Sequence, residues 1–272
     1  MRFSPHSKSS QKPTFYSSGT SVDKVLAAFG KIKADSLAGS LLLVGGRDYR
    51  SLNVRNAQTG LRYDRRSSYW SHAAVLTKWN AENPARSTGL EVALDPSDPI
   101  AQVPERNGVT AFQLRKYLDE RLYPNLALIH IALKDMPGEE NGKRIVAHSA
   151  GARREAAVTA ARNPCSQRET FRLWESLGTW LRYASAPELG PNPLQDNVPH
   201  PGASFCEYVY ASAEVDLVPG ASTSHTCPEL IWASVRHWQN TIDTPGSTLH
   251  AHVLIRDEYG QPLDPLPMTI KG

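Results

Sequence analysis

Residues 69–76 read Tyr-Trp-Ser-His-Ala-Ala-Val-Leu, a largely apolar run that follows a loop of arginines and serines. Such a run predicts a buried strand that is entered from a polar loop. His72 stands near its beginning, where an imidazole can face a cleft. A second strand is predicted over residues 89–94, and its Glu91 has apolar neighbours on both sides. Because a buried carboxylate is costly unless it is paired, we expect Glu91 to contact the imidazole of His72 on the neighbouring strand.

A base of this kind serves a nucleophile, and Cys206 is the first candidate. A serine cap at Ser204 followed by a helix of about ten residues would put Cys206 in the first turn. The unpaired N–H groups and the helix dipole there would lower the pKa of the thiol and bind an oxyanion. Cys227 has a similar setting, because a hydroxyl that can cap a helix precedes it and Pro228 follows it. The residues alone leave both cysteines open.

As an ordered set, these motifs resemble the circularly permuted papain-like hydrolases of the NlpC type, in the branch of the YiiX-like bacterial amidases and lecithin retinol acyltransferase. The resemblance is carried, in chain order, by residues 40–47, 71–75, 89–91, 107–118, 177–183, 205–209 and 216–220. It implies an α+β fold in which an antiparallel sheet packs against helices. It also implies a triad of Cys206 as nucleophile, His72 as base and Glu91 as the group that orients the base. Cys227 lies in residues 226–230, which resemble a structural motif of the family, and it stays the alternative nucleophile.

The implied reaction is cleavage of an amide or ester acyl bond through an acyl-enzyme, with a peptide, an amide or a lipid ester as substrate. The charged stretch over residues 47–66 predicts a polar rim near the histidine strand, which favours a hydrated amide substrate. The proline-rich loop over residues 186–202 is where an element that covers the substrate would lie. Hydrolysis and acyl transfer are not separated by the sequence.

A different nucleophile is offered by residues 147–151, Ala-His-Ser-Ala-Gly, which follow an apolar strand and open a predicted helix. This is the context of a serine nucleophile elbow at Ser149, and Asp243 followed by His250 or His252 would complete the order found in α/β-hydrolases. No glycine-rich oxyanion segment precedes it, so the serine hydrolase is the weaker hypothesis. A non-catalytic binding module on the same fold is the other alternative.

The composition fits one sizeable core, since 40% of the 272 residues are hydrophobic. The net charge of +3 is small and the arginines are scattered, so we expect no nucleic-acid partner. Three cysteines do not make a disulfide framework. With neither a CxxC pair nor an HExxH motif present, we expect no metal and no cofactor.

The first 22 residues have no apolar core and predict a flexible tail rather than a signal peptide, which leaves residues 23–272 as the catalytic domain. No run of ~18 apolar residues occurs, so we expect no membrane span and at most peripheral contact. The expected location is cytoplasmic, or exported by a route that needs no cleavable signal peptide. Further helices are predicted over residues 22–32, 111–122, 152–162 and 169–183, and strands over 41–44, 126–133, 144–147 and 250–255.

Overall fold

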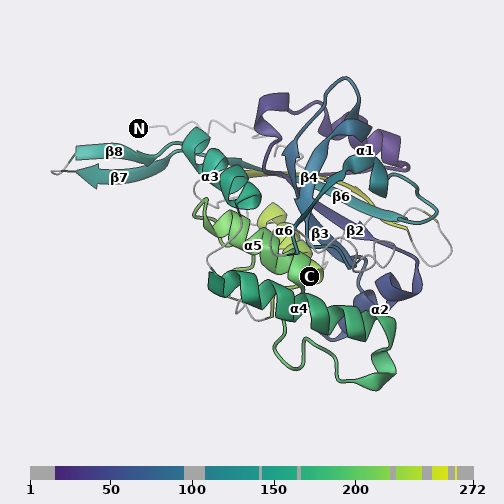
Figure 1. Ribbon diagram of the computed structural model, residues 1–272. Helices are drawn as coiled ribbons and strands as arrows, with labels where there is room; N and C mark the ends of the chain where they lie inside the picture. Colours follow the sequence, from purple (N-terminus) through teal and green to yellow (C-terminus); the bar gives the residue numbers. More distant parts are fainter. Residues whose placement is uncertain are drawn as a thin grey trace, which may run out of the picture.

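The computed structural model describes residues 16–94, 108–140, 143–163, 167–220, 225–240, 247–256 and 261 (Figure 1). Its helices are α1 (Val22–Phe29), α2 (Tyr49–Ala57), α3 (Ala150–Arg162), α4 (Gln167–Ser185), α5 (Pro201–Ala211) and α6 (Pro228–Asn240). Its strands are β1 (Tyr16–Ser18), β2 (Leu41–Gly45), β3 (His72–Lys78), β4 (Thr88–Glu91), β5 (Thr110–Gln113), β6 (Asn125–Leu133), β7 (Met136–Glu140), β8 (Lys143–His148) and β9 (Ser247–Leu254). A short 3-10 helix, η4 (Leu114–Tyr117), follows β5.

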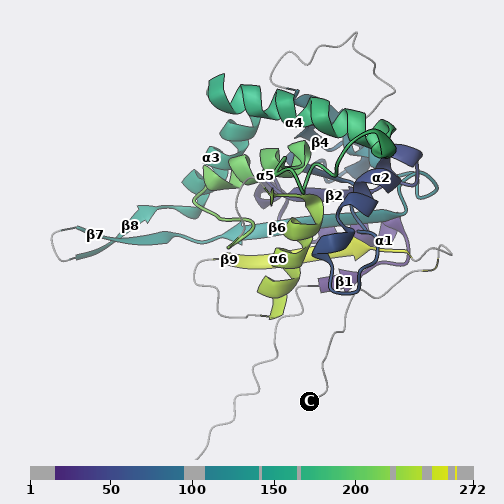
Figure 2. The same ribbon diagram turned by 90° about the horizontal axis from the view of Figure 1, so that it is seen from below.

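Seven of these strands form one sheet in the order β1-β9-β6-β2-β3-β4-β5. Every neighbouring pair is antiparallel except β1 and β9, which run parallel. The remaining two strands, β7 and β8, form a hairpin that projects from the body of the molecule (Figures 1 and 2). The α+β class, with an antiparallel sheet packed against helices, is therefore confirmed.

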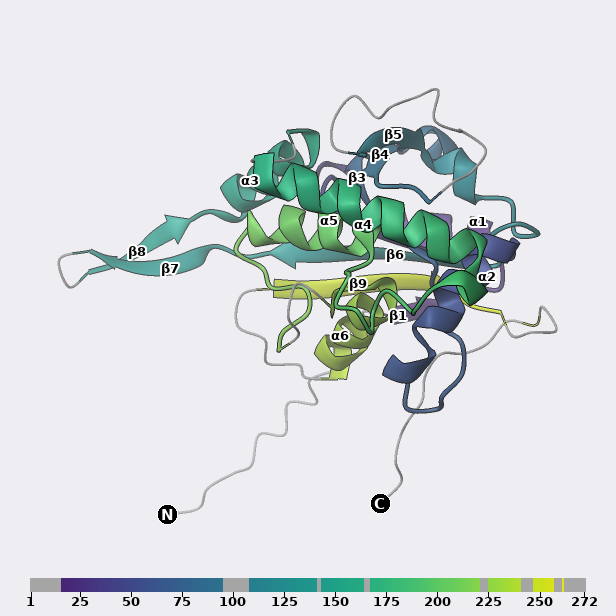
Figure 3. The same cartoon turned by 60° about the horizontal axis from the view of Figure 1, so that its bottom comes forward.

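Both faces of the sheet are covered, which explains why residues 73–76 of β3 are all apolar. Side chains alternate between the two faces of a strand, so Ala73 and Val75 join one core while Ala74 and Leu76 join the other. Helices α3, α4, α5 and α6 contribute to the first core, and α4 lies along the outside of α5 (Figure 3). Helix α1 and η4 cover the opposite face.

Most of the predicted elements are present, but the helix expected over residues 111–122 is wrong. Residues 110–113 instead form β5, which pairs with β4, and η4 follows at once. The pairing places Phe112 directly opposite Gly89, where a Cβ would come within 2.5 Å of the Phe112 ring. Long-range contact of this kind overrides a local helical pattern.

The start of the chain also differs from expectation within its described part. Residues 1–15 lie outside the described residues, but Tyr16–Ser18 pair with β9, and the Ser21 side chain caps α1. The arginine-rich stretch predicted as a polar rim contains α2, which Asp48 caps by accepting a hydrogen bond from the Ser51 N–H. None of the helices in the described ranges is long and apolar enough to cross a membrane.

Candidate active site

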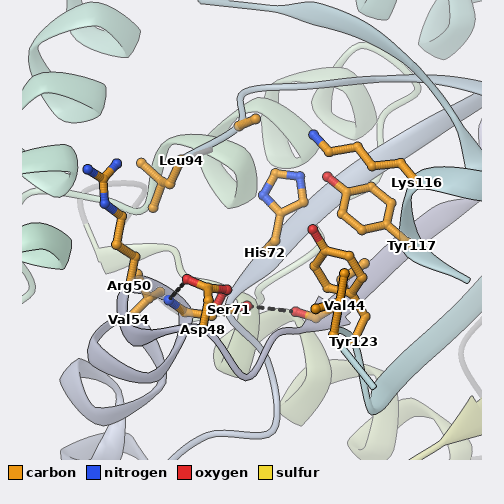
Figure 4. A pocket seen from close by; sticks show the side chains of 13 residues that line it. Val44, Asp48, Arg50, Val54, Ser71, His72, Leu94, Lys116, Tyr117 and Tyr123 are labelled. Carbon is orange, nitrogen blue, oxygen red and sulfur yellow. Dashed lines mark hydrogen bonds between the residues drawn. The ribbon is translucent and has the colours of Figure 1, made fainter. Parts of the chain in front are cut away.

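A cavity of about 290 Å³ lies where β3 begins, between α2 on one side and η4 on the other (Figure 4). Its lining includes the side chains of Asp48, Arg50, Ser71, His72, Lys116 and Tyr117. His72 occupies this position because it is the first residue of its strand, so its ring stands at the end of the sheet instead of inside the core.

The sheet register brings Glu91 to the imidazole. Glu91 pairs with Ala74, two residues beyond His72 on the same face of β3. His72 Nε2 lies 2.8 Å from Glu91 Oε2, and the carboxylate is only 1% exposed. The predicted pairing of His72 with Glu91 is confirmed, while their catalytic roles stay predictions.

Two further residues that the sequence interpretation did not single out bind the same carboxylate. The Tyr117 hydroxyl donates to Glu91 Oε2, and Lys116 Nζ lies 2.8 Å from Oε1. Burial alone would raise the pKa of Glu91, but the hydrogen bond and charge of His72, together with Lys116, outweigh it and hold the pKa below its ordinary value. Glu91 is therefore a carboxylate at neutral pH. In the sequence, the only signal for Lys116 and Tyr117 was that they lie in residues 107–118, which the family resemblance included.

The hydrogen bond to Glu91 decides which nitrogen of His72 can act as a base. With Nε2 donating to the carboxylate, Nδ1 carries the lone pair. Nδ1 has no hydrogen-bond partner among the described residues. Figure 4 shows the ring between Tyr117 and Lys116 on one side and Leu94 and Arg50 on the other. The geometry thus presents an oriented imidazole beside an open space.

Cys206 is not placed as expected. Helix α5 begins at Pro201, with His200 as its cap, so Cys206 lies in the second turn and the prediction of a Ser204 cap is wrong. Proline favours the first helical position, and His200 Nδ1 accepts the Ala203 N–H at 3.4 Å, which explains the earlier start. Cys206 is fully buried in the core between α5 and the sheet and does not line the cavity.

Burial also changes the electrostatics expected of the thiol. It raises the pKa of Cys206 well above the ordinary value of a thiol, and the charge of Glu207 adds to this effect. The expectation of a thiolate favoured by the helix terminus is therefore wrong for this geometry. The α5 residue beside the base is Gly202, where a Cβ would lie 3.4 Å from His72 Cε1 and 2.7 Å from the Ala73 carbonyl oxygen.

The alternative nucleophiles are also outside the cavity. Cys227 directly precedes α6, and burial raises its pKa to about 12. Ser149 is an exposed cap of α3 whose Oγ accepts the Ala152 N–H. Its proposed partner His252 packs against Phe29 of α1, on the opposite face of the sheet from α3. Asp243 lies outside the described residues.

His200 is a buried residue near the base that sequence analysis missed. Its ring centroid lies 6.5 Å from that of His72, and its Nε2 has no hydrogen-bond partner within the described ranges. Burial, with a smaller contribution from His72, lowers the pKa of His200 to about 3, so it is neutral. The sequence signal that could have located His200 was Pro201, because proline is typical of the first position of a helix and the residue before it is then the cap.

Of the two segments predicted to surround the substrate, the polar rim over residues 47–66 lies at the cavity and the loop over residues 186–202 does not. Two charged residues of the rim, Asp48 and Arg50, do line the cavity. The loop before α5 does not line it, since Asn192 Nδ2 donates to the Ala57 carbonyl at 2.7 Å and Leu194 packs in a cluster with Trp180. The loop is therefore docked on α2 and α4.

Within the described residues, no three His, Cys, Asp or Glu side chains are grouped as ligands of a metal ion. Comparison with protein-family models, with curated proteins and with solved structures finds no match to this chain. The permuted papain-like resemblance accordingly stays a prediction, and the function is argued from the cavity and its residues.

Proposed function

We propose that the protein is an amide or ester hydrolase in which His72 is the general base and Glu91 orients it. The observation that supports this best is the 2.8 Å contact between His72 Nε2 and Glu91 Oε2 beside a cavity. An ionised carboxylate on one imidazole nitrogen fixes the tautomer and stabilises the cation that forms when the other nitrogen takes a proton. The acyl bond is the substrate class that the sequence resemblance implies.

In this mechanism His72 Nδ1 removes a proton from the nucleophile while a bond forms to the carbonyl carbon. The imidazolium that results is paired with the Glu91 carboxylate. When the tetrahedral intermediate collapses, the bond to the leaving nitrogen or oxygen breaks and Nδ1 returns the proton to it. The base is restored, and an acid and an amine or alcohol are released.

Water is the nucleophile that this geometry favours. Neither serine hydroxyl of the cavity lining is directed at the base, because Ser71 Oγ donates to the Val44 carbonyl and Ser51 Oγ donates to Asp48. Cys206 is buried outside the lining with a raised pKa. Attack by a water molecule needs no protein thiol, and it gives hydrolysis through one addition and one collapse step, without an acyl-enzyme.

A thiol mechanism is the second candidate, and one observation favours it. Cys206 follows Gly202 by four residues on α5, so the two share a helix face, and Gly202 packs against His72. A displacement of α5 by about one helical turn, roughly 5 Å, would bring the sulfur to the base. The acyl-enzyme of the sequence prediction would then form on Cys206.

The test is turnover of butyryl-alanine 4-nitroanilide and 4-nitrophenyl butyrate by the full chain and its variants. We expect His72→Gln to lower kcat/KM by at least about 100-fold, the usual effect of losing a general base. Cys206→Ala should retain turnover under water attack and abolish it under thiol attack. Cys227→Ala is the matched control for loss of a buried thiol, and urea unfolding checks that each variant is folded.

Wild-type rates in folded His72→Gln would overturn the proposal. Binding of these compounds with no turnover by the wild-type protein would identify the cavity as that of a binding module instead.

A further inference from the structure

Arg50 differs from the other charged residues that line the cavity. The Asp48 carboxylate accepts from the N–H and the hydroxyl of Ser51, and Lys116 is paired with Glu91. Arg50 has no ion pair or hydrogen bond to any other residue in the described part of the chain. It lies in the first turn of α2 and is partly buried. Within the described ranges, its guanidinium in the cavity wall therefore makes no hydrogen bond or ion pair with the protein.

Among the described residues, the charged groups around Arg50 do not pair with it. Arg55, five residues further along α2, uses its guanidinium on the carbonyls of Ser68 and Gly46. Burial and then the positive charge of Arg47 lower the pKa of Arg55, so these two arginines lie near each other beside α2. The nearest carboxylate in sequence, Asp48, makes no ion pair with Arg50 at 4.0 Å or less. Within the described residues, the guanidinium of Arg50 therefore lines the cavity without an ion-pair partner.

Figure 4 shows Arg50 rising from α2 beside Leu94, across the cavity from Lys116 and Tyr117. The His72 ring stands between these two sides, with Nε2 engaged by Glu91. A ligand that reaches His72 Nδ1 can therefore extend toward Arg50 on the side away from the carboxylate. The planar guanidinium offers donors in a fork that matches a carboxylate or a phosphate.

We propose that Arg50 binds an anionic group of the substrate, a carboxylate or a phosphate, and so selects acyl compounds that carry a negative charge. This inference rests on the proposed hydrolase, but it can be tested without turnover. The Arg50 guanidinium and the oxyanion would form a charge-assisted pair, whose loss weakens binding by about tenfold or more.

The test is equilibrium binding by titration calorimetry, with succinate, inorganic phosphate and neutral succinamide as probes. We expect succinate or phosphate to bind the wild-type protein at least about tenfold more tightly than Arg50→Gln, and succinamide to bind no better to one than to the other. Arg115→Gln is the matched control, because Arg115 is an exposed arginine of η4 that does not line the cavity. The anion that binds more tightly identifies the group as carboxylate or phosphate.

Anion affinity that is equal in the wild type and Arg50→Gln, or no anion binding at all, would overturn the inference.

A matched substrate pair then connects binding to reaction: succinyl-alanine 4-nitroanilide differs from the butyryl compound only by a carboxylate in place of the terminal methyl group. We expect Arg50→Gln to lower the ratio of kcat/KM for succinyl over butyryl, mainly through KM. Arg50-dependent anion binding without any turnover would contradict the proposed hydrolase and support the anion site. Turnover together with Arg50-independent anion binding would support the hydrolase and contradict the anion site.

Discussion

At the scale of single residues, the site is organised around one carboxylate. Glu91 is nearly fully buried, yet it stays ionised because His72, Lys116 and Tyr117 all contact it. Two of these partners, His72 and Tyr117, share the same oxygen. The arrangement leaves the imidazole little freedom to turn, which is the property that an oriented base requires.

We therefore expect Glu91→Gln to lower kcat/KM by at least about 100-fold, because an amide fixes neither the tautomer nor the charge of the imidazole. Tyr117→Phe should lower kcat/KM about tenfold, since it removes one hydrogen bond and keeps the Glu91 carboxylate. Steady-state kinetics on the butyryl compounds measure both effects. Equal rates for Glu91→Gln and the wild type would show that the contact is structural only.

The buried cysteines give a second expectation at this scale. Cys206 and Cys227 are free thiols that burial keeps protonated, and both are inaccessible. Because only an exposed thiolate reacts quickly, we expect iodoacetamide to label both slowly in the native protein at pH 7.5 and at least about 100-fold faster in urea. Peptide mapping by mass spectrometry resolves the sites. Rapid native labelling of Cys206 would favour the thiol mechanism over water.

At the scale of elements, the contact between α5 and β3 sets the shape of the site. Gly202 lies so close to β3 that a Cβ would meet the Ala73 carbonyl oxygen at 2.7 Å, a backbone atom that cannot move aside. The same Cβ would contact the rings of His72 and His200. A glycine at this position therefore allows the helix terminus to approach the base.

We expect Gly202→Ala to lower the free energy of unfolding by about 1–3 kcal/mol and to reduce turnover, because α5 must shift away from His72. The matched control is Gly178→Ala in α4, where an added Cβ meets nothing within 4 Å. That change should be neutral or stabilise by about 0.5–1 kcal/mol, as alanine does in a helix. Urea unfolding of the two variants measures the contrast, and equal values would contradict it.

The elements also show what the sequence can and cannot predict. His72 and Glu91 were found because a polar residue in an apolar strand must be paired when it is buried. Lys116 and Tyr117 were missed because η4 was assigned to a helix, and its placement depends on Phe112 pairing across to Gly89. Such contacts join distant parts of the chain, and local patterns do not report them.

The start of α5 was misplaced by a related limitation. Ser204 is a good cap by residue type, but Pro201 and the side chain of His200 define the observed start. An error of a few residues moved Cys206 from the first turn to the second, which is enough to change an activated thiol into a core residue. Helix boundaries are the least certain part of a sequence-based prediction, and here the candidate nucleophile depended on one.

At the scale of the whole molecule, the two-sided burial of the sheet places histidines in the interior as neutral groups. His130 on β6 is 3% exposed, its Nδ1 is 3.2 Å from the Ser40 hydroxyl, and its ring stacks on that of His250. Burial, followed by the charges of His250 and Arg154, lowers the pKa of His130 to about 4. His200 is neutral for the same main reason.

These buried histidines make the free energy of unfolding depend on pH, and their lowered pKa values fix the direction of that dependence. Between the ordinary histidine pKa of about 6.5 and the lowered value, the unfolded chain binds a proton that the folded chain does not. The contribution of these histidines to the free energy of unfolding is therefore fully present above the ordinary histidine pKa, and it decreases as the pH falls toward the lowered pKa. For His130 the loss between pH 7 and pH 5 is on the order of 2 kcal/mol.

The measurement is urea unfolding at pH 7 and pH 5 for the wild type and His130→Asn, whose amide can keep the hydrogen bond to Ser40. We expect the variant to lose less stability over this interval than the wild type, by on the order of 1–2 kcal/mol. Glu207 and Glu229 have pKa values raised by burial and oppose the trend, but they are present in both proteins and cancel in the difference. An identical pH dependence in the two proteins would mean that His130 is protonated in the folded state, which would contradict its burial as a neutral group.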